Sequence, residues 1–210
     1  MTQVEEGTND WLETWSGQQF DPFSFTNEQI NVLDVAHALS MICRFGGHTK
    51  RFYSVAEHAI ILHDYAMQHN FGPRLAYEVL HHDDPEYVLG DKVRPLKGRM
   101  PEYERIERVV AMATAAHFHC RFPLPGELKF LDNHIIIDER AAVMNPSANE
   151  WHNEHWSPLG VKFWNIRGRS PEIMRRQYLK RHIARCKDLS LEHLIPEKAS
   201  FARPRRRSQR

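Results

Sequence analysis

Helix-initiation signals recur along this chain, and the clearest is the stretch Ser54-Val55-Ala56-Glu57. A serine three residues ahead of a glutamate forms a capping box, which satisfies free backbone N–H groups in the first turn of a helix. Ile61, Leu62 and Tyr65 then follow at helical spacing, and His58 falls on the same face. The box therefore predicts a helix that carries His58 on its buried side.

Other segments combine a start signal with apolar residues at helical spacing. A proline in the first turn or a capping residue just ahead of the pattern marks each beginning. These signals lie at Thr26–Gln29, Pro73, Pro101 and Ser170-Pro171, and a further pattern runs from Glu127 to Met144. The alternating patterns of strands and the Asn-Gly turns of hairpins are absent. We therefore expect an all-α helical bundle.

The character of the chain changes after residue 146. Trp151, Trp156 and Trp164 are spaced by polar residues, which predicts an irregular segment in which the tryptophans are packing anchors. The end of the chain, RPRRRSQR, is basic and predicts disorder. The predicted divisions are an N-terminal segment at 1–25, a helical domain at 26–146, an extension and helix packed on it at 147–196, and a basic disordered tail at 197–210.

Composition restricts the compartment and the partners. Lys+Arg 28 balances Asp+Glu 27, so no global charge attracts nucleic acid or a membrane surface. No apolar run approaches membrane-spanning length, and the start, MTQVEEGTND, is unlike a signal peptide. The 3 cysteines are too few and too far apart for a disulfide framework. We expect a cytoplasmic protein without a membrane partner, and the sequence leaves the oligomeric state, including a homo-oligomer, open.

The stretch VLHHDDPEYVLGD, residues 79–91, concentrates groups that bind metals or transfer protons. If it is helical, Glu86 lies one turn from His82 and Asp83, and those two can converge on one ion. His58 and Asp132 each fall on a core-facing stripe of another helix, where a lone polar side chain is costly unless it is paired. Mixed imidazole and carboxylate donors suit Mn, Fe, Co or Zn, and Mg less well. The alternative is a solvated helix end with separately bonded side chains, and spacing alone leaves it open.

Three separated blocks resemble the HD-domain metal-dependent phosphohydrolases, in the order found in that family. The likeness is to the group of bacterial YfbR-type 5′-nucleotidases and related bacterial and phage enzymes, some of which act on dATP. It implies an HD-domain fold from about residue 34 to 144. The blocks are DVAHALSMICRFGGHTKRFYSVAEHAI, LHHDDPEYVLGDKVRPLK and LKFLDNHIIIDERAAVM.

The resemblance implies a role for nine side chains. The metal ligands are His58, His82, Asp83 and Asp132, and Glu86 is the catalytic acid or base. Contacts to the substrate fall on Arg44 and Lys97 for phosphate, Phe45 near the base and Asp91 at the sugar. One departure is Asp84-Pro85, where the family mostly has small residues. We expect Pro85 to free the carbonyl of His81 and kink the helix, and Asp84 to face solvent.

The expected reaction is metal-dependent hydrolysis at the α-phosphorus of a (deoxy)nucleotide. A monophosphate would give nucleoside and phosphate, and a dNTP, dATP in particular, would give nucleoside and triphosphate; a monophosphate is slightly favoured. Two alternatives stand beside this function. One is a nucleotide-binding regulatory HD module without turnover. The other is a nucleic-acid-binding module formed by the C-terminal tail and the basic helix face, whose residues are Arg175, Arg176, Lys180, Arg181 and Arg185.

Overall fold

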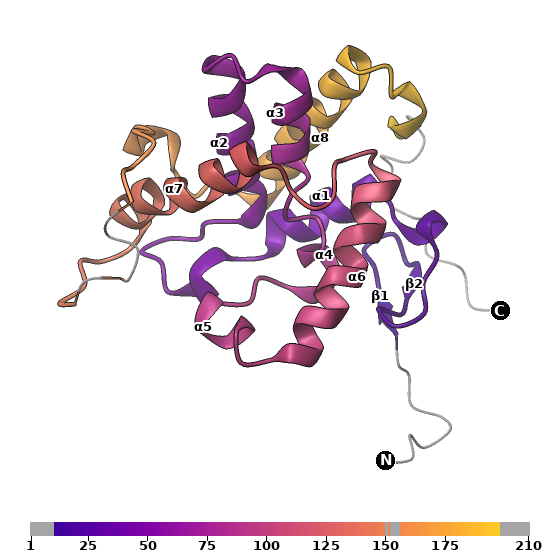
Figure 1. Ribbon diagram of the computed structural model, residues 1–210, viewed down its shortest axis with the longest axis horizontal. Helices are drawn as coiled ribbons and strands as arrows, with labels where there is room; N and C mark the ends of the chain where they lie inside the picture. The colour runs from indigo at the N-terminus through magenta and orange to yellow at the C-terminus, as the bar shows by residue number, and fades with distance from the viewer. Residues whose placement is uncertain (1–10, 150, 152–155, 198–210) are drawn as a thin grey trace.

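The computed structural model describes residues 11–149, 151 and 156–197, and it is mainly helical (Figure 1). This confirms the expected predominance of helix. The α-helices of the described residues are α1 (Val32–Met41), α2 (Val55–Gln68), α3 (Gly72–Leu80), α4 (Glu86–Leu89), α5 (Arg94–Lys97), α6 (Pro101–His117), α7 (Gly126–Val143) and α8 (Pro171–Asp188). Short 3-10 turns are η1 (Asn27–Gln29), η2 (Arg44–Gly47), η3 (Phe163–Asn165) and η4 (Glu192–Leu194). Within the described residues, no helix combines the length and the apolar character that crossing a membrane requires.

A small antiparallel hairpin, β1 (Leu12–Glu13) with β2 (Gln19–Phe20), precedes the helices and was not predicted. Two residues per strand are too few to produce an alternating pattern in the sequence. The hairpin is held by side chains of its turn: the hydroxyls of Thr14 and Ser16 donate to Asp34 Oδ2 at 2.8 and 2.7 Å. Asp34 is buried in the first turn of α1, so the hairpin is fastened to the helical core.

The predicted capping box at Thr26 forms, but it starts a 3-10 turn rather than the first long helix. The Gln29 side chain accepts from the Thr26 N–H at 2.7 Å. The helix α1 begins only at Val32, where the Asn31 side chain accepts from Leu33 N at 2.9 Å. The expected helix start was therefore too early, because a second capping residue follows the first within one turn.

The helix start at Ser54 is confirmed, but only the N-cap half of the box forms: the Ser54 hydroxyl accepts from Glu57 N at 3.1 Å and α2 follows. The Glu57 side chain has a different role from the one expected of a capping box. It is buried, and its carboxylate accepts the backbone N–H groups of residues 167–169. The segment after the tryptophans is thus fixed to the beginning of α2.

The HHDDP stretch is not helical, contrary to the prediction. The helix α3 ends at Leu80, residues 81–85 form turns, and α4 begins at Glu86. Pro85 has no N–H to reach the carbonyl of His81, so the regular helix bond is missing there. The carbonyl accepts instead from Asp84 N at 3.2 Å, which tightens the chain into a turn. The expected kink is therefore a complete break between two helices.

The core has two parts, and α2 contributes to both. One part lies between α1, α2, α3 and α8, and the other lies between α2, α3 and α7 (Figure 1). The predicted inner stripe of α7 is confirmed, with Leu128, Leu131 and Ile135 at no more than 1% exposure. Burying each such side chain contributes roughly 1.5–3 kcal/mol.

Helix α8 begins at the predicted Ser170-Pro171 pair, and of the apolar residues at helical spacing Tyr178 and Leu179 are buried, whereas Ile173 is 38% exposed. The buried face also includes His182, which an apolar pattern does not identify. His182 is accommodated since its Nε2 donates to the carbonyl of Leu194 at 3.1 Å.

Gly168 tests the anchoring of the segment after the tryptophans. Its φ is +66°, and a Cβ would lie 2.2 Å from the Phe52 carbonyl oxygen. We expect Gly168→Ala to lower the free energy of unfolding by about 2–3 kcal/mol in a denaturant titration. The control Gly98→Ala has φ −63° and open space around it, and should stay within about 0.5 kcal/mol. Equal stability of the two variants would contradict the described anchoring.

His182 gives the core a dependence on pH. Burial, and then the charge of His81, lower the pKa of His182 to about 3, against an ordinary value of 6.5. At a pH between these two pKa values, His182 binds a proton in the unfolded chain but not in the folded protein. The free energy of unfolding therefore falls as the pH falls from 6.5 toward 3. In His182→Gln this contribution disappears, and the slope of unfolding free energy against pH should decrease by up to about 1.4 kcal/mol per pH unit. Parallel curves for variant and wild type would contradict a neutral, buried His182.

Candidate metal centre

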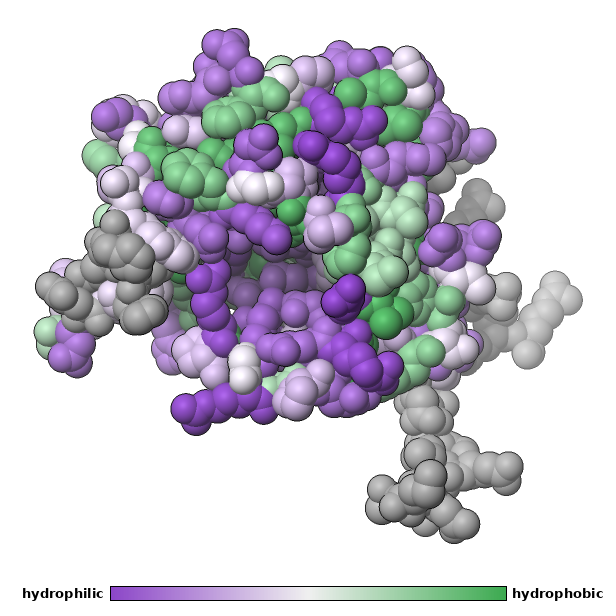
Figure 2. Space-filling model, in the orientation of Figure 1, coloured by the Kyte–Doolittle hydropathy of each residue, from purple (hydrophilic) through white to green (hydrophobic). Residues whose placement is uncertain are grey.

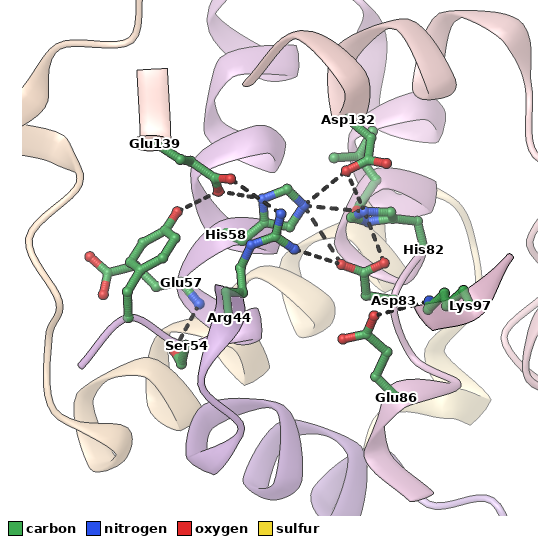
Figure 3. A network of polar contacts seen from close by, with 12 residues as sticks. Arg44, Ser54, Glu57, His58, His82, Asp83, Glu86, Lys97, Asp132 and Glu139 are labelled. Carbon is green, nitrogen blue, oxygen red and sulfur yellow. Dashed lines mark hydrogen bonds and ion pairs between the residues drawn. The ribbon is translucent and has the colours of Figure 1, made fainter. Parts of the chain in front are cut away.

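Three side chains from separate parts of the fold meet beneath a hollow of the molecule (Figure 3). They are His58 in the first turn of α2, His82 in the turn after α3, and Asp132 in α7. The two Nε2 atoms lie 3.3 Å apart, and Asp132 Oδ1 is 3.3 Å from that of His58 and 3.5 Å from that of His82. One donor atom of each residue lies within 4.8 Å of the others, so this cluster could hold a metal ion.

The fourth predicted ligand, Asp83, faces the same point. Its Oδ1 is 3.2 Å from His82 Nε2, and its Oδ2 is 3.6 Å from His58 Nε2. Asp83 Oδ2 is buried and makes no hydrogen bond, although Arg44 Nη1 lies 3.5 Å away. The oxygen therefore has an ion-pair partner but no hydrogen bond, and its remaining lone pairs are available to a second cation at the cluster.

The hydrogen bonds of the two imidazoles orient both rings toward the cluster. His82 Nδ1 contacts the Val79 carbonyl at 2.7 Å, and His58 Nδ1 contacts Glu139 Oε1 at 2.5 Å. A carbonyl and a carboxylate only accept, so both Nδ1 atoms carry protons and both Nε2 atoms face the centre of the cluster, where each ring in its neutral form would offer a lone pair to a cation. Fixing the tautomer through the second nitrogen is the usual arrangement of metal-binding histidines.

The charges around the cluster are consistent with the same conclusion. Burial lowers the pKa of His82, but the carboxylates of Asp83 and Asp132 raise it to about 10. Burial raises the pKa of Asp132, yet contacts with His58 and His82 hold it well below its ordinary value. The site thus has a strongly negative potential that stabilises a positive charge between these groups. Nitrogen and oxygen donors together fit a divalent transition metal.

Sequence reasoning missed Glu139, which orders this side of the cluster. It is fully buried and accepts from His58, from the Tyr53 hydroxyl at 2.7 Å and from Arg44 Nη2 at 3.2 Å (Figure 3). Burial raises its pKa, but Arg44 and His58 lower it to about 2. The signal was present, because Glu139 follows Ile135 by four residues and therefore lies on the inner stripe of α7.

Glu86, the predicted acid or base, begins α4 at the wall of the hollow. Its side chain is buried, its Oε2 has no hydrogen bond, and Lys97 Nζ lies 3.9 Å from its Oε1. Burial, followed by the negative charges of Asp83 and Asp91, raises its pKa well above the ordinary value. A raised pKa favours the protonated form of this carboxyl, which suits it to exchange a proton with a partner.

A cavity of about 930 Å³ opens above the cluster, and Figure 2 shows the hollow with hydrophilic side chains around its mouth. His58 and His82 are buried beneath it. Its lining includes the remaining seven predicted site residues, which are Arg44, Phe45, Asp83, Glu86, Asp91, Lys97 and Asp132. The fold thus brings all nine predicted side chains to one place.

The other lining residues include two cationic and two aromatic side chains that were not predicted for the site: Lys92, Arg94, Trp151 and Trp156. The Arg140 guanidinium lies 4.4 Å from the ring centre of Trp151, and Trp156 stacks on His134 at 5.7 Å. The two tryptophans are thus attached to α7 and border the cavity. The expectation that all three tryptophans are packing anchors is wrong for Trp164, which is 50% exposed. The sequence does not show which tryptophans border the cavity, because that depends on tertiary contacts.

Asp84 does not face solvent, and that prediction is wrong. It is fully buried, and its carboxylate accepts from the Tyr178 hydroxyl at 2.6 Å and contacts His81 Nδ1 at 2.6 Å. The break of the helix at Pro85 turns this side chain inward, which a helical projection could not show.

Much of the basic face of α8 is engaged within the protein. Arg181 pairs with Asp64 at 2.5 Å, and Arg185 pairs with Asp188 at 2.7 Å. The guanidinium of Arg175 lies 5.1 Å from the ring centre of Trp15. These contacts reduce the charge that the face can offer to nucleic acid. The basic tail predicted at 197–210 lies outside the described residues except for its first position.

Fold and site together define a mainly helical protein with a candidate metal centre beneath a cavity that has both charged and aromatic side chains in its lining. No protein-family model matches the chain. It is 32% identical over 130 residues to the uncharacterized protein YfdR of Escherichia coli, covering 62% of this chain and 70% of YfdR. It is 28% identical over 192 residues to an uncharacterized protein of Rhodobacter capsulatus, covering 86% of this chain and 97% of that protein. The chain belongs to the family of YfdR.

Proposed function

We propose that this protein is a metal-dependent phosphohydrolase of the HD type that acts on a nucleotide at the α-phosphorus. The observation that carries the proposal is the convergence of the His58 and His82 Nε2 atoms with two carboxylates at the base of a cavity. The likeness of three sequence blocks to HD phosphohydrolases supports it independently of the geometry. His58, His82, Asp83 and Asp132 are the proposed ligands.

The ion we propose is Mn, Fe, Co or Zn, with Mg less suited to the imidazoles. When bound, a divalent ion polarises a phosphoryl oxygen and lowers the pKa of a bound water. Glu139 and the Val79 carbonyl keep both imidazoles in the tautomer that leaves Nε2 available.

The other polar side chains supply proton transfer and charge. Glu86 Oε2, without a hydrogen bond inside the protein, faces the cavity and exchanges the proton that hydrolysis requires. The guanidinium of Arg44 is held between Asp83 and Glu139, so it presents a fixed positive edge to phosphate. The ammonium of Lys97 lies between Glu86 and Glu107, at 3.9 and 2.6 Å, on the other wall.

The rest of the cavity suits a nucleoside better than a bare phosphate ester. Its volume lies within the range of small-molecule sites, about 300–1,000 Å³. Phe45, Trp151 and Trp156 give it aromatic surface on which a base can stack, and Asp91 can accept a sugar hydroxyl. The proposed products are nucleoside and phosphate from a monophosphate, or nucleoside and triphosphate from a dNTP such as dATP.

Removing the Asp83 charge tests the metal requirement. We expect Asp83→Asn to lose bound metal by elemental analysis and to lose phosphate or triphosphate release across a panel of nucleotides with Co, Mn, Zn and Mg. The control Asp188→Asn changes an exposed aspartate on α8 and should keep both properties. Wild-type turnover that survives complete removal of metal by a chelator would refute the proposal.

Glu86→Gln separates metal binding from proton transfer. The variant should keep the metal content of the wild type, because Glu86 is not a proposed ligand. Its kcat should fall by about 100-fold or more, since an amide cannot exchange the proton. Glu102→Gln, at the exposed start of α6, is the matched control. A kcat for Glu86→Gln within a few-fold of the control would assign the proton transfer to another group.

A further inference from the structure

The stretch His81-His82-Asp83-Asp84 divides into two pairs that face opposite directions. His82 and Asp83 face the candidate metal centre, as described above. His81 and Asp84 face the core between α3 and α8, where they are 5% and 0% exposed. Four adjacent residues thus connect the metal centre with the interior of the helical bundle.

The inward pair is bonded to a tyrosine of α8. The Tyr178 hydroxyl donates to Asp84 Oδ1 at 2.6 Å and lies 3.2 Å from His81 Nδ1. Asp84 Oδ2 is 2.6 Å from His81 Nδ1. Three buried side chains therefore contact one another, although Tyr178 is more than 90 positions from the other two in the sequence.

The hydrogen bonds continue from His81 through a second histidine, His182, to the backbone of Leu194. His81 Nε2 lies 3.0 Å from His182 Nδ1, and His182 Nε2 lies 3.1 Å from the Leu194 carbonyl. The carbonyl only accepts, so His182 Nε2 donates to it and its Nδ1 accepts from His81 Nε2. The donors of these two bonds are thereby fixed, from His81 through His182 to the Leu194 carbonyl.

We propose that Tyr178, Asp84, His81 and His182 form a positioning network that holds the turn of His82 and Asp83 in the geometry of metal binding. This inference rests on the proposed metal centre. The turn has no regular helix bond at Pro85, so its shape needs other restraints. Each proposed ligand in the turn has a covalent neighbour that is anchored to α8, His81 on one side and Asp84 on the other. Partners behind metal ligands commonly control affinity through such orientation.

The network would connect helix α8 to the metal centre, although α8 does not line the cavity above it. None of its residues lines the cavity above the cluster. Its buried stripe instead presents a hydroxyl and an imidazole to the back of the turn. Losing them leaves buried polar partners unsatisfied, and the turn can then relax toward other conformations.

A matched pair of tyrosines tests the proposal. Tyr178 and Tyr77 are both 0% exposed, and the Tyr77 ring lies 4.5 Å from that of His81 between ring centres, but its hydroxyl makes no hydrogen bond to Asp84, His81 or His182. We expect Tyr178→Phe to raise the dissociation constant for Co²⁺ or Mn²⁺ about tenfold in chelator competition, and Tyr77→Phe to leave it unchanged. The visible spectrum of the Co²⁺ protein should change in Tyr178→Phe alone, which a loss of stability without repositioning would not produce.

Two substitutions of Asp84 provide a second test, because one of them keeps the hydrogen bonds of the network and the other removes them. Asp84→Asn can still accept from Tyr178 and can donate to His81 Nδ1, so the network persists without the charge. We expect Asp84→Asn to bind metal within about threefold of the wild type and Asp84→Ala to bind at least about tenfold more weakly. Thermal unfolding of the metal-free variants measures how much of each change is due to stability.

The outcomes separate this inference from the proposed function. If the wild type binds none of the metals in the panel (Co, Mn, Zn and Mg), both the proposed function and the positioning role are wrong. If the wild type binds metal but Tyr178→Phe and Tyr77→Phe bind equally well, the positioning role alone is wrong. Should Asp84→Ala not fold, the tyrosine pair still decides.

Discussion

The site depends on one electrostatic constraint: two imidazoles direct their Nε2 atoms at each other across 3.3 Å, with carboxylates on either side. The Val79 carbonyl and the buried Glu139 carboxylate fix this arrangement, because each can only accept the Nδ1 proton. A positive charge between the rings turns an unfavourable meeting of lone pairs and anions into a favourable one. The cavity, the cation of Arg44 and the buried carboxyl of Glu86 are arranged around that point.

Buried carboxylates join the segments that build the site. Glu57 binds the backbone of residues 167–169, and Glu139 joins α7 to Tyr53 and His58. Asp84 joins the turn that contains His82 and Asp83 to α8. Each accepts more than one donor, as burial of a charge requires. Apolar packing brings α2, α3, α7 and α8 together, and these acceptors select the orientation of the polar side chains between them.

Sequence patterns predicted those parts of the structure that depend on local rules. The box at Ser54 and the stripe of α7 follow from capping and periodicity, so the faces carrying His58 and Asp132 were predictable. The break at Pro85 and the burial of Asp84 were not, because a helical projection continues through a turn. Glu139 was recoverable from the stripe that it shares with Ile135. The tryptophans at the cavity depend on contacts with α7 that adjacent sequence does not encode.

The central claim is that His58, His82, Asp83 and Asp132 surround one cation. X-ray absorption spectroscopy at the metal edge of the Co²⁺- or Zn²⁺-loaded protein tests it most directly, since imidazole rings give a distinctive outer-shell scattering. The account predicts two imidazoles and oxygen donors around the metal, at about 2.0–2.2 Å for zinc. A spectrum without imidazole scattering, or one that is unchanged when both histidines are replaced, would contradict it.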